Sequence, residues 1–125
     1  MKQIKVGTFP LGHENVELYA IPSADGGCFY FQPADNSLPR IKIGLDYDRW
    51  DQVVSVLLHE TMEFLMARLL NRYEQTGVYG DHASYLFMFT HCQFSDLCQR
   101  QAKFVAAALP EVAAHWNKLK AKKKK

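Results

Sequence analysis

Apolar and polar residues alternate in the first third of the chain, at residues 2–9, 16–21 and 40–45, and the aromatic-rich segment 28–32 has the composition of a further strand. A period of two is typical of a strand with one buried face. The connections between these segments are too short for crossover helices, which favours antiparallel pairing. The pattern therefore predicts a small antiparallel sheet of three to four strands in the N-terminal third.

The apolar period changes after Tyr47, and the chain from Trp50 to about Tyr73 contains neither Gly nor Pro. Asp48 is a suitable N-cap for a helix over this segment. At 100° per residue we expect one inward side to carry Gln52, Ser55, Val56, His59, Glu63, Met66 and Leu70. We expect a narrow solvent-exposed side that carries Thr61, Arg68 and Arg72. Because apolar residues cover most of the circumference, this should be a central helix, covered on several faces.

A second long helix is predicted to start at Thr90. Thr90 and Gln93 have the spacing of a capping box, and Phe89 and Phe94 flank it as a hydrophobic staple. We expect this helix to end near Leu109. Segment 84–89 is apolar and aromatic, and its pattern leaves strand and helix both open.

Pro110 fits the first turn of a separate last helix, which runs into a lysine-rich end. We expect residues 1–118 to form a single domain and residues 119–125 to be a disordered basic tail. The element order predicts an α+β fold in which the sheet packs on the central helix and the second long helix.

The net charge of +2 is a property of that tail, because five of the 15 lysines and arginines lie in residues 119–125. The composition, 48% hydrophobic and 13% aromatic, is that of a globular protein. We find no signal-peptide pattern and no membrane-length apolar run, so we expect a cytoplasmic protein without a membrane partner. Its three cysteines have no framework spacing and are expected to be reduced, partly buried thiols: Cys28, Cys92 and Cys98.

The segment Val54–Glu63, VSVLLHETME, places three polar groups in the central helix. His59 and Glu63 are four residues apart, so their side chains leave the same face and could hold one metal ion. Glu60 lies about 100° away, where a carboxylate could act as the general base on a metal-bound water. The structural alternative is a His59–Glu63 pair, or Glu63 bonded to a Tyr or Arg elsewhere.

A catalytic zinc needs three protein ligands and an open position, so a third ligand has to come from outside this helix. His91 is the best placed candidate, because the capping box puts it in the first turn of the next helix. His82, Asp81 and Asp96 remain open as alternatives. His13 and His115 are expected to be surface or packing residues.

The strand IKIGL, the acidic connection and the LLHE helix resemble the compact zincin-like proteins of phages and prophages. FTHCQFSDLC extends the resemblance loosely, over residues 40–110 in all. The family implies an edge strand just before the motif helix, metal ligands at His59 and Glu63, and a catalytic base at Glu60. Glu63 stands where the family usually has His.

Two functions follow as leading hypotheses. The first is a zinc-dependent peptidase or hydrolase, with zinc held by His59, Glu63 and His91 and a peptide or protein as substrate. The second is a non-catalytic phage or prophage protein that uses the same fold to bind a host protein. Nucleic acid is expected to make only weak contact with the tail LKAKKKK. Small-molecule binding would rest on aromatic residues that we expect to be mostly core: Phe29, Tyr30, Phe31, Phe87 and Phe89.

Overall fold

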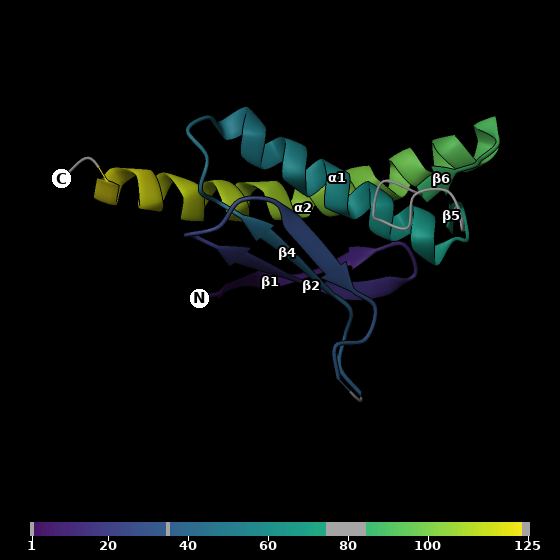
Figure 1. Cartoon of the computed structure of the whole chain (residues 1–125), viewed down its shortest axis with the longest axis horizontal. Coiled ribbons are helices and arrows are strands. Elements are labelled where there is room, and N and C mark those ends of the chain that lie inside the picture. Colours follow the sequence, from purple (N-terminus) through teal and green to yellow (C-terminus); the bar gives the residue numbers. More distant parts are fainter. Residues whose placement is uncertain (1, 35, 75–84, 124–125) are drawn as a thin grey trace.

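The computed structural model describes residues 2–34, 36–74 and 85–123. A four-stranded sheet forms one layer, and two helices cover one of its faces (Figure 1). The strands precede the helices along the chain, so the predicted α+β class is confirmed. A shared apolar core joins the two layers.

The sheet contains β1 (Ile4–Leu11), β2 (Glu14–Ile21), β3 (Gly27–Tyr30) and β4 (Arg40–Gly44), in the order β1-β2-β4-β3. β1 pairs with β2, and β3 with β4, in antiparallel fashion. The prediction of an entirely antiparallel sheet was wrong for one pair, because β2 and β4 are parallel. The chain leaves β2, forms β3 at the edge and returns as β4, and this strand-containing excursion serves as the crossover that a parallel pair requires.

β4 is therefore an internal strand, between β2 and β3. The edge strand that the zincin-like resemblance implied just before the motif helix is not β4. The open edge beside the helix belongs to β3, which comes one strand earlier in the chain. On the face of β4 that the helices cover, Ile41 and Ile43 are fully buried, whereas Arg40 and Lys42 on the opposite face are only partly buried.

The motif helix, α1 (Trp50–Arg68), lies over β3 and β4, whereas α2 (His91–Lys123) lies over β1 and runs the length of the molecule (Figure 1). Between the helices, β5 (Arg72–Glu74) and β6 (Tyr85–Phe87) form a small antiparallel hairpin at one end of the molecule. The ambiguous segment 84–89 thus contains a short strand. Its first residue lies outside the described part of the chain.

α1 ends earlier than predicted, at Arg68 rather than near Tyr73. Leu70 adopts a left-handed conformation with φ of 61°, and Asn71 N–H donates to the Met66 carbonyl at 2.7 Å. This is a Schellman ending built on a non-glycine residue, which the absence of Gly from the segment concealed. The helix start was also misplaced by one residue, since Arg49 rather than Asp48 is the N-cap and Gln52 accepts its backbone N–H at 3.1 Å.

The predicted start of α2 is confirmed. Thr90 N–H donates to Gln93 Oε1 at 2.7 Å, Gln93 N–H donates to Thr90 Oγ1 at 3.2 Å, and the rings of Phe89 and Phe94 stack with centroids 5.6 Å apart. These contacts satisfy free amides of the first turn and set the direction in which the chain enters the helix.

The predicted break at Pro110 was wrong, because α2 continues through it to Lys123. Val112 is fully buried beyond the proline, and Trp116 and Leu119 pack against the core. Burial of this continued apolar face offsets the cost of the missing N–H. Residues 119–123 of the segment predicted as a tail are consequently helical, and Lys123 pairs with Asp46 at 3.2 Å.

One buried cluster joins the sheet to both helices. Its members are apolar residues at most 2% exposed: Leu11, Val16, Leu18, Ala20, Ile41, Ile43, Leu45, Val53, Leu57, Phe64, Leu65, Leu97, Phe104, Ala108 and Val112. β2 and β4 contribute every second residue, as their alternation predicted. The three cysteines are free, as predicted, although Cys28 and Cys92 are exposed rather than partly buried.

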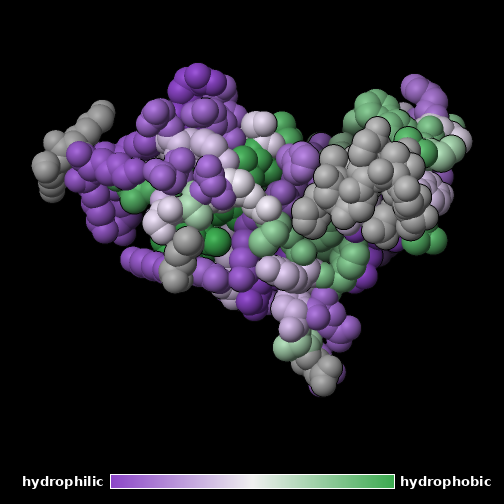
Figure 2. All heavy atoms as spheres, in the orientation of Figure 1, coloured by the Kyte–Doolittle hydropathy of each residue, from purple (hydrophilic) through white to green (hydrophobic). Residues whose placement is uncertain are grey.

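The surface differs between the two ends of the molecule (Figure 2). The lysine-rich end of α2 is hydrophilic, whereas apolar residues gather at the other end, over β6 and the start of α2. The large exposed apolar residues there are Leu86, Phe87, Met88, Phe89 and Phe94. Within the part of the chain that the structure describes, neither helix combines the length and apolar character that crossing a membrane requires.

We predict that Pro110→Ala raises the free energy of unfolding by about 2 kcal/mol, because alanine restores the helical N–H and Pro110 is exposed. Urea denaturation followed by circular dichroism measures the change. The control is Asn117→Ala, an exposed site in the same helix, which should gain less than about 0.7 kcal/mol. Equal gains at the two sites would contradict a specific cost at the proline.

Candidate functional site

The side of α1 that faces the core differs from the one that the sequence pattern suggested. Its buried residues are Val53, Leu57, Glu60, Thr61, Phe64 and Leu65. His59 and Glu63 were expected on the inward side, but the His59 side chain is 68% exposed and that of Glu63 is 18% exposed. The helix is therefore rotated so that Glu60 turns inward and His59 lies at its rim.

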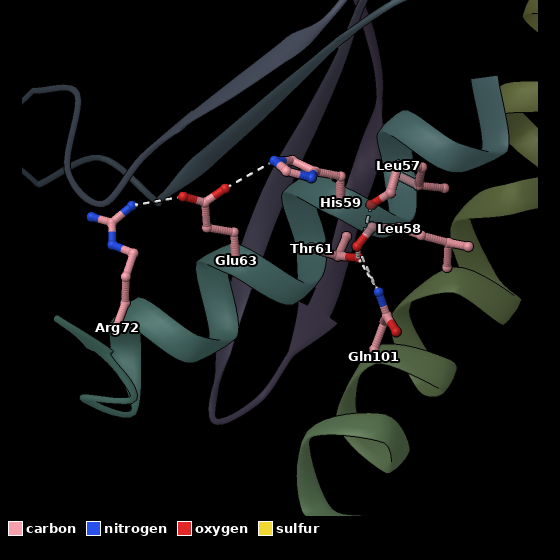
Figure 3. A network of polar contacts seen from close by, with 7 residues as sticks. All are labelled: Leu57, Leu58, His59, Thr61, Glu63, Arg72 and Gln101. Carbon is pink, nitrogen blue, oxygen red and sulfur yellow. Dashed lines mark hydrogen bonds and ion pairs between the residues drawn. The ribbon is translucent and has the colours of Figure 1, made fainter. Parts of the chain in front are cut away.

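Thr61 explains part of this rotation, and its placement on the solvent-exposed side was wrong. Its hydroxyl donates to the Leu57 carbonyl at 2.8 Å, which satisfies the hydroxyl within α1 itself. Gln101 of α2 then donates from Nε2 to Thr61 Oγ1 at 2.9 Å and to the Leu58 carbonyl at 2.8 Å (Figure 3). A hydroxyl that bonds back to its own helix can be buried between two helices at little cost.

Glu63 lies between two basic side chains (Figure 3). His59 Nε2 is 3.0 Å from Glu63 Oε2, and Arg72 Nη1 donates to Glu63 Oε1 at 3.1 Å. The structural alternative of a His59–Glu63 pair and a bond to an arginine is thus confirmed in both parts. Arg72 thus hydrogen-bonds to one carboxylate oxygen, and His59 lies within ion-pair distance of the other.

Arg72 reaches this position because the chain reverses at Leu70 and enters β5. Its guanidinium centre lies 4.2 Å from the ring centroid of Tyr85 and 5.5 Å from that of Phe29. Two aromatic faces and one carboxylate therefore hold the cation, which immobilises it and offsets its partial burial. Arg72 ties α1, the edge strand and the β5–β6 hairpin together at one point.

Glu60 lies beneath the edge strand and is only 7% exposed. A Cβ at Gly27 would lie 2.8 Å from Glu60 Cγ and 2.9 Å from the Lys42 carbonyl oxygen, so glycine permits this close approach. Burial raises the pKa of the Glu60 carboxyl above its ordinary value; the charge of His59 opposes this shift, and that of Glu63 adds to it. No hydrogen bond or ion pair reaches its carboxylate from residues 2–34, 36–73 or 85–123.

These groups surround a pocket of about 680 Å³, which we call the motif pocket. Its walls come from β3, α1, β5 and β6: Gly27, Cys28, Phe29, His59, Glu60, Glu63, Arg72, Tyr85 and Phe87. The pocket combines acidic, basic and aromatic side chains in one concave site beside an open sheet edge. Such a combination is suited to binding a ligand through charge and apolar contact together.

The described residues supply two of the three donors that a catalytic zinc requires. His59 and Glu63 come together, but among residues 2–34, 36–73 and 85–123 no three His, Cys, Asp or Glu side chains are grouped to hold a metal ion. His91 is exposed at the first residue of α2 and does not join them. Asp96 pairs with Arg100 at 2.7 Å, and His82 and Asp81 lie outside the described residues.

The chemistry of the pair also disfavours zinc in this arrangement. The Arg72 guanidinium bonds to Glu63, so a divalent cation placed there would meet a like charge at close range. The predicted ligand set of His59, Glu63 and His91 is not brought together among the described residues. Zinc binding by the chain therefore stays a prediction.

The sequence pattern did not assign Gly27, Arg72 or Tyr85 to a site. It predicted Arg72 on the exposed side of a longer helix, and Tyr85 lies in segment 84–89, for which strand and helix were both open. The acid-rich motif was the one signal that pointed to this region. The aromatic cluster was core only in part, since Phe29 and Phe31 pack on Phe64 whereas Tyr30, Phe87 and Phe89 are exposed.

Comparison of the chain with models of protein families, with curated proteins and with solved structures found no match. The resemblance to compact zincin-like proteins remains an expectation from the motif and its flanking segments.

We predict that Glu60→Gln stabilises the fold near neutral pH. The pKa of Glu60 is raised in the folded state, so ionising this carboxyl lowers the free energy of unfolding. The penalty is absent at low pH, where Glu60 is protonated in both states, and it grows as pH rises above about 4.5. The gain measured by urea denaturation at neutral pH should therefore shrink at about pH 4.

The matched control for this measurement is Glu63→Gln. It removes charged partners from both His59 and Arg72, so it should lower the free energy of unfolding by about 1 kcal/mol. Destabilisation by Glu60→Gln at neutral pH would show instead that a partner in the folded protein stabilises the ionised Glu60.

Proposed function

We propose that the chain is a binding protein that holds an extended polypeptide segment of another protein along the open edge of β3, over the motif pocket. The main observation in support is that both carboxylate oxygens of Glu63 are in ion-pair contact, one with His59 and the other with Arg72. Glu63 therefore positions the arginine, which favours a binding role for the pocket over a metal-dependent one. The resemblance to phage and prophage proteins makes a host protein the expected partner.

The ladder between β3 and β4 supports binding along this edge. Gly44 N–H donates to the Gly26 carbonyl at 2.7 Å, and residue pairs alternate in an antiparallel ladder. By this alternation Cys28 and Tyr30 bond inward to β4, whereas Phe29 turns its backbone N–H and C=O toward the open edge. Among the described strands β3 has no neighbour on that side, so an extended segment could pair with it.

The motif pocket adds specificity to such pairing. A segment that lies beside β3 presents alternate side chains to α1, where the pocket has room for a large one. Phe87, which is 38% exposed, offers apolar contact at the wall, and Glu60 and Arg72 offer charge. Backbone pairing supplies affinity in this mode of recognition, and the pocket selects the side chain.

We predict that peptides selected on the protein from a random display library bind at β3 and depend on Phe87. Phe87→Ala should weaken the binding of a selected peptide by at least about tenfold, because Phe87 lines the pocket. Fluorescence anisotropy measures the affinity, and amide NMR locates the shifts. Phe94→Ala, at an exposed phenylalanine that does not line the motif pocket, is the matched control and should leave binding unchanged. Peptide shifts confined to other elements would contradict the proposal.

A zinc-dependent hydrolase is the second candidate, and the position of Glu60 favours it. Glu60 is a buried carboxylate that lines the same pocket as His59 and Glu63, as a general base of this kind should. This function needs a third donor from outside the described residues, and Arg72 has to leave Glu63.

The hydrolase predicts that tag-free protein contains close to one zinc ion per chain by elemental analysis. Less than about 0.2 metal ion per chain would contradict it, since structural and catalytic sites retain zinc through purification. If zinc is present, Glu60→Gln should abolish hydrolysis of a casein substrate and retain the metal, whereas His59→Ala should lose the metal.

A further inference from the structure

Glu60 is the one charged group of the motif pocket that the described residues leave without a partner. The pocket is lined by two carboxylates and one guanidinium, and the guanidinium bonds to Glu63. His59 also contacts Glu63 rather than Glu60. The negative charge that remains belongs to Glu60, at the buried side of the pocket beneath Gly27.

A buried carboxylate without a hydrogen-bond partner is costly, and it destabilises the fold unless something else pairs with it. Gly27 is part of the same arrangement, because any side chain there would press on Glu60. Within the part of the chain that the structure describes, the strand and the helix thus leave the charge of Glu60 without a partner. An arrangement of this kind is expected where the partner is a ligand.

We propose that the motif pocket binds a primary ammonium group, in the form of a lysine side chain of the bound polypeptide, with Glu60 as its counter-ion. This inference rests on the proposed function for the identity of the ligand as a polypeptide. It names the side chain that enters the pocket beside β3.

The walls of the pocket suit a lysine. Phe87 and the ring edges of Phe29 and Tyr85 can cover an alkyl stem, while the ammonium group reaches the carboxylate at the buried end. Arg72 already lies over the rings of Tyr85 and Phe29, two of the aromatic rings on which an arginine could stack. A second guanidinium would also meet Arg72, whereas a compact ammonium places its charge on Glu60 alone.

Small probes test the ammonium site without a partner protein. In amide NMR titrations, n-butylammonium should shift Gly27, Phe29 and Glu60, with a dissociation constant on the order of millimolar. n-Butanol, its neutral counterpart, should leave these amides unshifted, and n-butylguanidinium should bind more weakly. Equal effects of n-butanol or n-butylguanidinium would overturn the inference.

Variants then identify the counter-ion. Glu60→Gln should weaken the binding of n-butylammonium by at least about tenfold. Gly27→Ala should also weaken this binding, because the added Cβ displaces Glu60. Asp96→Asn removes a carboxylate that is paired with Arg100 elsewhere, so it is the matched control and should leave binding unchanged. Retention of binding in Glu60→Gln would overturn the role of Glu60.

The two proposals fail in different ways. If n-butylammonium binds through Glu60 but display selection returns no peptide that shifts β3, the polypeptide function fails and the ammonium site stands. If selected peptides bind along β3 but replacing each of their lysines by norleucine leaves affinity unchanged, the ammonium inference fails and the polypeptide function stands.

Discussion

The rotation of α1 about its own axis is the constraint on which the rest of the structure depends. Gln101 sets it from α2, by donating to both the Thr61 hydroxyl and the Leu58 carbonyl. Thr61 has no exposed surface, and the half-buried Gln101 reaches its hydroxyl from the other helix. With Thr61 held there, Glu60 is turned under the edge strand and His59 is left at the rim. That orientation sets which side chains of α1 line the motif pocket.

The same orientation determines what the acidic motif can do. His59 and Glu63 are adjacent, as residues four apart on a helix must be, but the third group at Glu63 is a guanidinium rather than a metal donor. Arg72 is available because the chain reverses at Leu70 immediately after the helix. The sequence motif suggests a metal site, but in the folded protein Glu63 is ion-paired with His59 and Arg72, beside the buried carboxylate of Glu60.

Burial also explains how α2 tolerates Pro110. A proline inside a helix costs about 3 kcal/mol relative to alanine. The residues that follow it, Val112, Trp116 and Leu119, join the core on the same face as those before it. Ending the helix at the proline would expose that face to water. Apolar packing therefore outweighs the local signal, and the lysine-rich end of the chain extends the helix to Lys123.

Much of this protein was determined by its sequence alone. The alternation of apolar residues located β1, β2 and β4, and aromatic composition located β3. The capping box and staple located the start of α2, and the acidic motif pointed to the region of the pocket. These features depend on contacts between residues near one another in the chain, so local patterns record them.

Tertiary structure decided the parallel pairing of β2 with β4, the rotation of α1, the continuity of α2 and the placing of Arg72 against Glu63. Each of these depends on contacts between distant segments. α1 is apolar over most of its circumference, so its periodicity is compatible with several orientations, and only Gln101 and the sheet select one. Gly27 likewise has a role only because the packed helix brings Glu60 beneath it.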